Sequence, residues 1–171
     1  RESQRYMKLS VDAIMAIAFA IALGIVSVSR LFAPIFWGED FAPCAYILSA
    51  LALSIPFSGF ANVIRMQYLI PNGMDGAYIL SVILGAVSNL TANSLLIPRC
   101  GALGAAVGTV IAEGVVCAAQ CLAVKKRIDI LAYLKSTAFF GMAGLLMYGA
   151  VRVLDQRAEI TVSWLLLEIV V

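Results

Sequence analysis

The chain has 171 residues, of which 63% are hydrophobic and only 13% are charged, and its formal net charge is +2. A soluble domain is ordinarily about 45–50% apolar, so this composition excludes a water-soluble fold with a catalytic domain of its own. The small positive charge does not fit a nucleic-acid-binding protein. We therefore expect lipid to be the solvent of this chain.

The inventory of reactive residues excludes most kinds of active site. There are four cysteines but no histidine, which rules out Cys–His and Ser–His catalytic arrangements and the usual metal-site spacings. The sequence also lacks a phosphate-binding loop, a dinucleotide fingerprint and paired acids at catalytic spacing. We expect no enzymatic activity, no cofactor and no metal, with cysteines that pack as small apolar residues; a disulfide between Cys44 and Cys100 stays open.

Six apolar blocks follow one another along the chain, separated by short segments rich in Pro, Gly and charge. They cover residues 12–36, 44–68, 77–97, 102–124 and 134–154, and a sixth begins near residue 160 and is cut short. A membrane-spanning helix needs about 20 apolar residues, whereas a barrel strand would need about ten and would alternate. The sequence predicts an all-α polytopic transmembrane helix bundle of about six spans, in a chain interpreted as a fragment of a longer protein.

Positive charge is distributed unequally between the two predicted sides of the membrane. Alternate loops assign eight Lys and Arg residues to one side, namely Arg1, Arg5, Lys8, Arg65, Lys125, Lys126, Arg127 and Lys135. The other side receives four, namely Arg30, Arg99, Arg152 and Arg157. The positive-inside rule then predicts a cytoplasmic N-terminus and a cytoplasmic loop after the fourth block.

The second block carries a polar stripe. Ser54, Ser58, Asn62 and Arg65 recur at spacings of four, four and three, which places them on one helix face. A proline and a glycine in the same block predict a bend of the kind found near transporter substrate paths. We expect the stripe to face a cavity, although Arg65 also fits a side chain that snorkels to the cytoplasmic interface.

The third block carries two amides on its smallest face. Asn89 and Asn93 follow Gly85 at spacings of four, so we expect them to face protein rather than lipid. Hydrogen bonds between helices, worth about 0.6 kcal/mol each in membranes, are one interpretation. Contact with a polar ligand is the other, and the sequence favours neither.

The fourth block has two different faces. Gly104 and Gly108 form a small-residue face that lets another helix approach closely, whereas Thr109, Glu113 and Gln120 fall on roughly the opposite side. Glu113 lies near mid-membrane, where an ionised side chain costs at least about 2.5–3.5 kcal/mol unless it is paired or hydrated. It is the best single functional candidate, as a proton or cation site, as the partner of an arginine, or as a buried neutral acid.

Three stretches have a familiar order: LFAPIFWGEDFAPCAYILSALA, then NVIRMQYLIPNGMDGAY, then SNLTANSLLIPRCGALGAAVGTVIAEGVV. They resemble the C-terminal part of bacterial polysaccharide flippases, in the multidrug/oligosaccharidyl-lipid/polysaccharide exporter superfamily. The resemblance covers about residues 31–124. Its most specific part is Asn-x-x-x-Asn-x-x-Leu-Ile-Pro followed by Gly-Ala-x-Gly-Ala-Ala.

The resemblance implies that the chain is the second lobe of an exporter-type transporter in the bacterial inner membrane. Such a protein moves an undecaprenyl-diphosphate-linked oligosaccharide between leaflets by alternating access. The implied partners are this substrate, membrane lipids, the missing N-terminal lobe and the polysaccharide polymerase machinery, without nucleic acid. The candidate cavity residues are Ser58, Asn62, Arg65, Asn89, Asn93, Thr109, Glu113 and Gln120.

Two other functions stay open from the residues. One is a drug or metabolite antiporter of the same superfamily, driven by protons or sodium through Glu113. The other is a structural membrane subunit that transports nothing, in which the polar groups only lock helices together.

Overall fold

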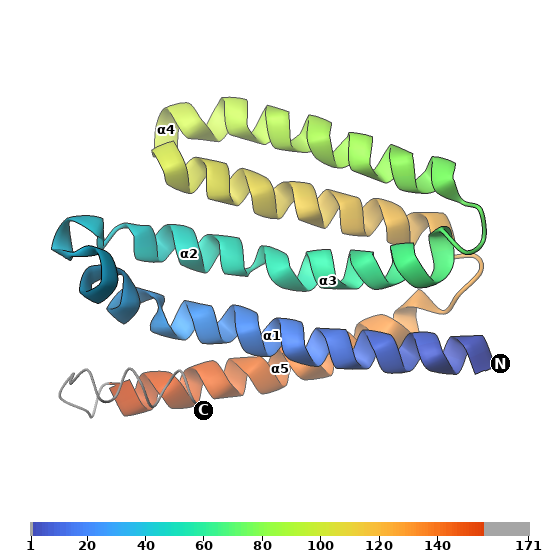
Figure 1. Ribbon diagram of the computed structural model, residues 1–171, viewed down its shortest axis with the longest axis horizontal. Helices are drawn as coiled ribbons and strands as arrows, with labels where there is room; N and C mark the ends of the chain where they lie inside the picture. Colours follow the sequence, from blue (N-terminus) through green and yellow to red (C-terminus); the bar gives the residue numbers. More distant parts are fainter. Residues whose placement is uncertain (1, 156–171) are drawn as a thin grey trace.

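The computed structural model describes residues 2–155, and this part of the chain is helical almost throughout, without a β-strand (Figure 1). The elements are α1 (Glu2–Trp37), the 3-10 turn η1 (Glu39–Phe41), α2 (Cys44–Ala52), α3 (Ser54–Ile64), the π-helical segment η2 (Arg65–Leu69), α4 (Asp75–Val124) and α5 (Ile130–Asp155). The predicted all-α class is confirmed for these residues.

Within the described residues, four helical segments are long and apolar enough to cross a membrane. They are Arg5–Trp37, Cys44–Leu69, Asp75–Val124 and Ile130–Val153. The predicted count of about six spans is therefore not supported. The third and fourth predicted blocks lie together in α4, which folds back on itself at Gly101, where φ is 56° and ψ is −134° (Figure 1). The sixth predicted block lies outside the described residues.

The two halves of α4 pack against each other at glycines. A Cβ atom added at Gly104 would clash with the backbone carbonyl of Leu96, and one added at Gly108 would clash with the side chain of Asn93. Only glycine at these positions lets the backbones come this close, as in small-residue packing between membrane helices. The predicted small-residue face is confirmed, and its partner is the preceding half of the same helix.

The second span is interrupted where its sequence predicts a bend. α2 ends at Ala52, four residues before Pro56, and α3 begins two residues later. Proline has no N–H, and its ring crowds the carbonyl four residues earlier, so the break at this point follows from Pro56. At its other end the span widens into η2, in which the Ile70 N–H donates to the Arg65 carbonyl at 3.0 Å.

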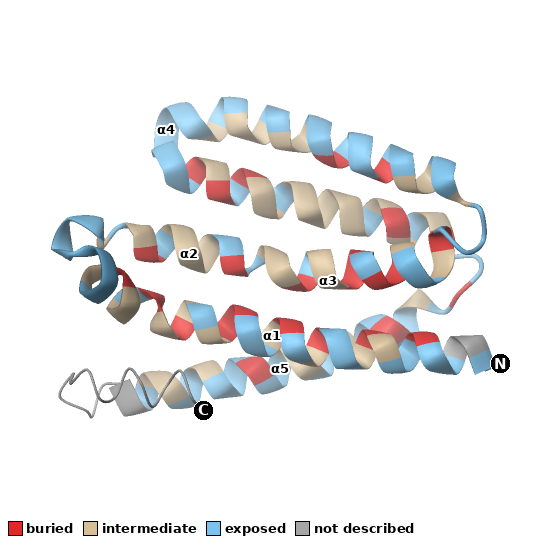
Figure 2. Cartoon of the chain, in the orientation of Figure 1, coloured by how far each residue is buried: buried red, intermediate tan, exposed pale blue. Residues whose placement is uncertain are grey.

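The buried core lies where α1, α3 and the connection from α4 to α5 meet. It consists of Met7, Val11, Met15, Phe60, Val63, Ile64, Leu69, Val124, Ile128 and Tyr133. α5 packs along α1, where Ser136 donates a hydrogen bond to the carboxylate of Asp12. Figure 2 shows the buried residues as short patches on helix sides that face a neighbouring helix.

The outward sides of the helices suit a lipid solvent. Large apolar residues such as Leu90 and Leu146 are 70% and 76% exposed. Exposed hydroxyls donate to carbonyls of their own helix: Thr91 to Val87 and Ser94 to Leu90, each at 2.8 Å. Such internal bonds are needed where hydrocarbon offers no partner. The described chain is therefore a bundle with several helices that can cross a membrane.

Positive charge is concentrated at one end of the bundle. The N-terminus, the turn between η2 and α4, and the connection between α4 and α5 lie together at that end (Figure 1). The described cations there are Arg5, Lys8, Arg65, Lys125, Lys126, Arg127 and Lys135, whereas Arg30, Arg99 and Arg152 lie toward the other end. The predicted partition of charge is thus found for the described residues, while Arg1 and Arg157 lie outside them, and the cytoplasmic location of the basic end stays a prediction.

Replacing Gly104 by Val should destabilise the α4 hairpin by about 1–3 kcal/mol, because the new side chain meets the backbone of Leu96, which cannot rotate away. Reversible unfolding of the purified chain in mixed micelles measures the change. Gly114→Val in the same helix is the matched control, since a Cβ there meets nothing within 4 Å. Equal losses of stability for both variants would contradict this packing.

Candidate functional site

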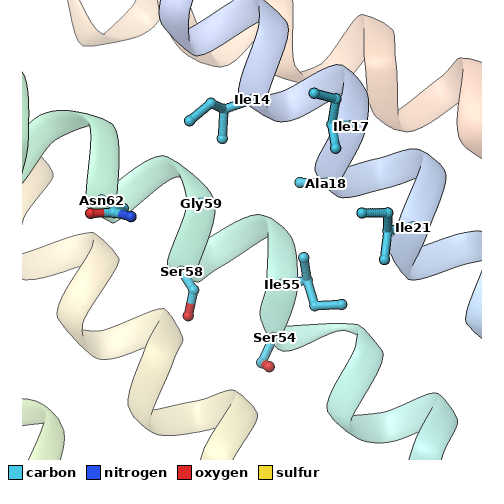
Figure 3. A pocket seen from close by; sticks show the side chains of 9 residues that line it. All are labelled: Ile14, Ile17, Ala18, Ile21, Ser54, Ile55, Ser58, Gly59 and Asn62. Atoms are coloured by element: carbon cyan, nitrogen blue, oxygen red, sulfur yellow. The ribbon is translucent and has the colours of Figure 1, made fainter.

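An open groove of about 430 Å³ runs between α1 and α3. It is lined by Ile14, Ile17, Ala18, Ile21, Ser54, Ile55, Ser58, Gly59 and Asn62. Figure 3 shows the isoleucines of α1 across from Ile55 of α3, while the hydroxyls of Ser54 and Ser58 on α3 point away from α1 in this view. The α1 wall is therefore hydrocarbon, whereas the α3 side combines Ile55 with hydroxyl and amide groups.

Gly59 holds the two walls at a short distance from each other. A Cβ atom at Gly59 would lie 3.2 Å from Cγ2 of Ile14 and 3.7 Å from Cβ of Ala18. α1 and α3 therefore touch at this point, and a larger residue would push the walls apart.

Arg65 stands at the end of the polar stripe. Its Nη2 donates to Oδ1 of Asn62 at 2.6 Å, and its Nη1 lies 3.5 Å from the hydroxyl of Tyr78. The guanidinium carbon lies 5.4 Å from the centre of the Tyr78 ring, within reach of a cation–π contact. The side chain therefore links α3 to the first half of α4.

Arg65 has only neutral partners among the described residues. Its Nε–H is buried and makes no hydrogen bond, and no carboxylate of the described chain pairs with the guanidinium. A half-buried cation without a counter-charge costs free energy, because desolvation is not offset by a Coulomb attraction. An anion at this place would remove that cost.

The groove side of the stripe offers hydrogen-bond donors. Asn62 accepts through Oδ1, so its amide nitrogen, with two N–H groups, makes no bond to the described chain. Ser58 likewise makes no hydrogen bond there, whereas Ser54 donates to the Leu51 carbonyl at 2.7 Å. The structure thus brings Ser58, Asn62 and Arg65 together as the sequence predicts.

The amides of the first half of α4 face the second half. Nδ2 of Asn93 donates to Oδ1 of Asn89 at 2.9 Å, and Asn93 lies against Gly108. Oδ1 of Asn93 is buried without a partner. The bond between the two amides lies within one half of α4, and Asn93 packs against Gly108 of the other half, so the predicted hydrogen bond between helices is not seen at these residues.

Gln120 also belongs to the interior of the hairpin. Its Nε2 donates to Oγ of Ser81 at 3.2 Å, and both residues are only 1% exposed. The prediction that Gln120 lies opposite the small-residue face is wrong, because Gly104, Gly108 and Gln120 all contact the first half of α4. Residues at multiples of four form one inclined ridge on a helix, and the crossing of the two halves follows that ridge.

The other two residues predicted in the fourth block differ in their hydrogen bonding. The hydroxyl of Thr109 donates to the Ala105 carbonyl at 3.1 Å and is satisfied within its own helix. Glu113 is half-buried and makes no hydrogen bond or ion pair with the described residues. An arginine partner from this part of the chain is therefore not seen.

Several polar contacts were not predicted from the sequence. Ser81 continues the four-residue spacing of Gly85, Asn89 and Asn93 by one turn, and that signal could have identified it. Ser29 and Ser49 join α1 to α2 through hydroxyls 2.8 Å apart, for which the sequence gives no comparable signal. All four cysteines are free, so the open pairing of Cys44 with Cys100 is not formed.

The α4 hairpin thus contains hydrogen-bonded amides, whereas the groove is bordered by the unpaired Ser58 hydroxyl and Asn62 amide nitrogen. No family model matches the chain, and no curated protein or solved structure matches it. The groove is the place that offers free groups to a ligand.

The bond between Ser81 and Gln120 should appear as a coupling energy of about 0.6 kcal/mol, and at most about 1.7 kcal/mol, in a double-mutant cycle. The variants are Ser81→Ala, Gln120→Leu and the pair, with unfolding in mixed micelles as the measurement. Ser94→Ala with Gln120→Leu is the matched control, because Ser94 bonds only its own helix. A coupling no larger than that of the control would show that the hydrogen bond stabilises nothing.

Proposed function

We propose that this chain is the second lobe of a transporter that moves an undecaprenyl-diphosphate-linked oligosaccharide across the bacterial inner membrane. The observation that carries the proposal is a groove lined by the unpaired Ser58 hydroxyl and Asn62 amide nitrogen, with the cation of Arg65 bonded to Asn62 beside it. The resemblance of residues 31–124 to polysaccharide flippases supplies the class of substrate.

The two walls match the two parts of such a substrate. Diphosphate oxygens accept charge-assisted hydrogen bonds from a guanidinium, and sugar hydroxyls exchange hydrogen bonds with the Ser58 hydroxyl and the Asn62 amide. Lipid tails are as apolar as isoleucine, so an isoprenoid chain gains little free energy by moving from lipid onto the α1 wall. Affinity therefore comes from the polar wall, while the apolar wall lets the tail stay in hydrocarbon.

The backbone of the second span is irregular on both sides of the stripe. The break before Pro56 lies at one end, and the π-helical segment η2, which begins at Arg65, lies at the other. Both features interrupt the regular ladder of backbone hydrogen bonds and give α3 points at which it can bend. Such bending can assist alternating access, in which the N-terminal lobe implied by the resemblance would close the cavity from the opposite side.

A second candidate function is favoured by Glu113. A half-buried carboxylate inside a span, without a partner among the described residues, suits the uptake of a proton or sodium ion. An antiporter of the same superfamily would use it to couple an ion gradient to the export of a drug or metabolite.

A purely structural role explains the α4 hairpin better than it explains the groove. The Ser81–Gln120 bond joins the two halves of α4, which is what a role in holding helices together requires. A purely structural role does not explain why the donors of Ser58 and Asn62 remain unpaired.

Protection of a cysteine at position 58 tests the flippase proposal. In the parent protein with its native cysteines replaced, Ser58→Cys should react with a small water-soluble thiol reagent. Undecaprenyl diphosphate at ten times its dissociation constant should slow the reaction by about tenfold, since protection follows the ratio of ligand to dissociation constant. Undecaprenol, which lacks the phosphates, should protect far less. Mass spectrometry of the labelled protein measures both rates.

Two matched variants complete this experiment. Arg65→Gln should abolish the protection, whereas Arg65→Lys should retain part of it, because a single ammonium keeps the charge but loses the planar fork. Ser81→Cys should be unreactive throughout, since Ser81 is buried. A cysteine at position 58 that no water-soluble reagent reaches, or equal protection by undecaprenol, would contradict the proposal.

Glu113→Gln distinguishes the second candidate from the first. If the parent is an ion-coupled antiporter, removal of the titratable group should lower gradient-driven transport in proteoliposomes by about tenfold or more. Glu39→Gln, in the exposed turn η1, is the matched control and should leave transport unchanged. Transport that survives Glu113→Gln would remove Glu113 from the coupling mechanism.

A further inference from the structure

Three segments meet at the basic end of the bundle: the first turns of α1, the connection from α4 to α5, and the first turns of α5 (Figure 1). Met7, Val124, Ile128 and Tyr133 from these segments belong to one buried cluster. The exposed cations that surround this meeting point form a group that we call the basic rim: Arg5, Lys8, Lys125, Lys126, Arg127 and Lys135.

The basic rim has a clear excess of positive charge. The acids on the same segments are Glu2, Asp12 and Asp129, so six cations face three carboxylates, a surplus of three. Asp12 accepts a hydrogen bond from Ser136, and Asp129 accepts one from the Ala132 N–H at 3.2 Å. No cation of the rim forms an ion pair with a residue in the described range. The positive charges are therefore available to an external anion.

The position of the rim identifies the kind of anion. Arg5, Lys125, Lys126 and Arg127 lie at or just beyond the ends of candidate spans, and Lys8 and Lys135 lie within their first two turns, which is near the level of lipid headgroups. Exposed apolar side chains stand among the cations, with Leu9 at 56% and Leu131 at 63% exposure. Cations beside exposed leucines match a phospholipid, which presents a phosphate and acyl chains together.

We propose that the basic rim binds anionic phospholipid headgroups of the leaflet at this end of the bundle. The phosphodiester oxygens accept hydrogen bonds from Lys and Arg, and the acyl chains cover the neighbouring leucines. Because the rim joins α1, α4 and α5, a bound lipid holds three elements together. This inference does not depend on which solute the groove between α1 and α3 carries.

Lipid binding by the purified full chain in a neutral detergent tests the proposal. Native mass spectrometry should detect phosphatidylglycerol or cardiolipin bound about tenfold more tightly than phosphatidylcholine. Neutralising the connection with K125Q, K126Q and R127Q together should lower phosphatidylglycerol binding by about tenfold or more. The matched control K125R, K126R and R127K keeps the charge and should bind as the unmodified chain does.

Two measurements on the unmodified chain keep the proposal falsifiable if the triple variant does not fold. Raising the sodium chloride concentration should weaken phosphatidylglycerol binding, since exposed charges are screened by salt. Inorganic phosphate should not displace the lipid, because it lacks the acyl chains. Equal binding of phosphatidylcholine, insensitivity to salt, displacement by inorganic phosphate, or full binding by the neutralised variant would overturn the assignment.

Discussion

Hydrocarbon neither accepts nor donates hydrogen bonds, so the polar side chains of the bundle need partners within the protein, in water or in a ligand. Most of them are satisfied locally. Hydroxyls such as those of Thr91 and Thr109 bond a carbonyl one turn earlier, and the amide of Gln120 reaches a serine on the facing half of α4. Against that background the few groups without a partner stand out, since each costs free energy unless water or a ligand reaches it.

Packing divides the described chain into a stiff part and a deformable part. The α4 hairpin is held by close packing of Gly104 against the backbone of Leu96 and of Gly108 against the side chain of Asn93, which leaves little room for shifts of one half against the other. The neighbouring span is broken before Pro56 and widened at η2, so its backbone lacks a continuous hydrogen-bond ladder. The polar stripe lies on the deformable span, and Arg65 ties it to Tyr78 on the stiff one. Movement of α3 relative to α4 would therefore change the surroundings of the one cation in the stripe.

Much of this fold could be predicted from residues that act locally. The break near Pro56, the close approach at Gly104 and the contact between Asn62 and Arg65 depend on proline chemistry, side-chain size and helical spacing. The contacts that could not be predicted depend on how the helices cross. The partner of Gln120 follows from the crossing of the two halves of α4, and the role of Tyr78 follows from where α4 begins beside η2. Helical spacing assigns a residue to a face, but it does not say which neighbour that face meets.

Polar groups that hold helices together differ from those of a binding site in whether they are already paired within the protein. A hydrogen bond between helices uses a donor of one and an acceptor of the other, as the Gln120 amide nitrogen and the Ser81 hydroxyl do in the buried hairpin. A binding site for a solute has to leave groups unpaired when it is empty, and it has to leave them where the solute can enter. Ser58 and the amide nitrogen of Asn62 meet both conditions, because they border an open groove and have no partner in the described chain. Both groups can donate hydrogen bonds, so the ligand that completes them carries acceptors, and the positive charge of Arg65 beside Asn62 favours an anion over a neutral molecule.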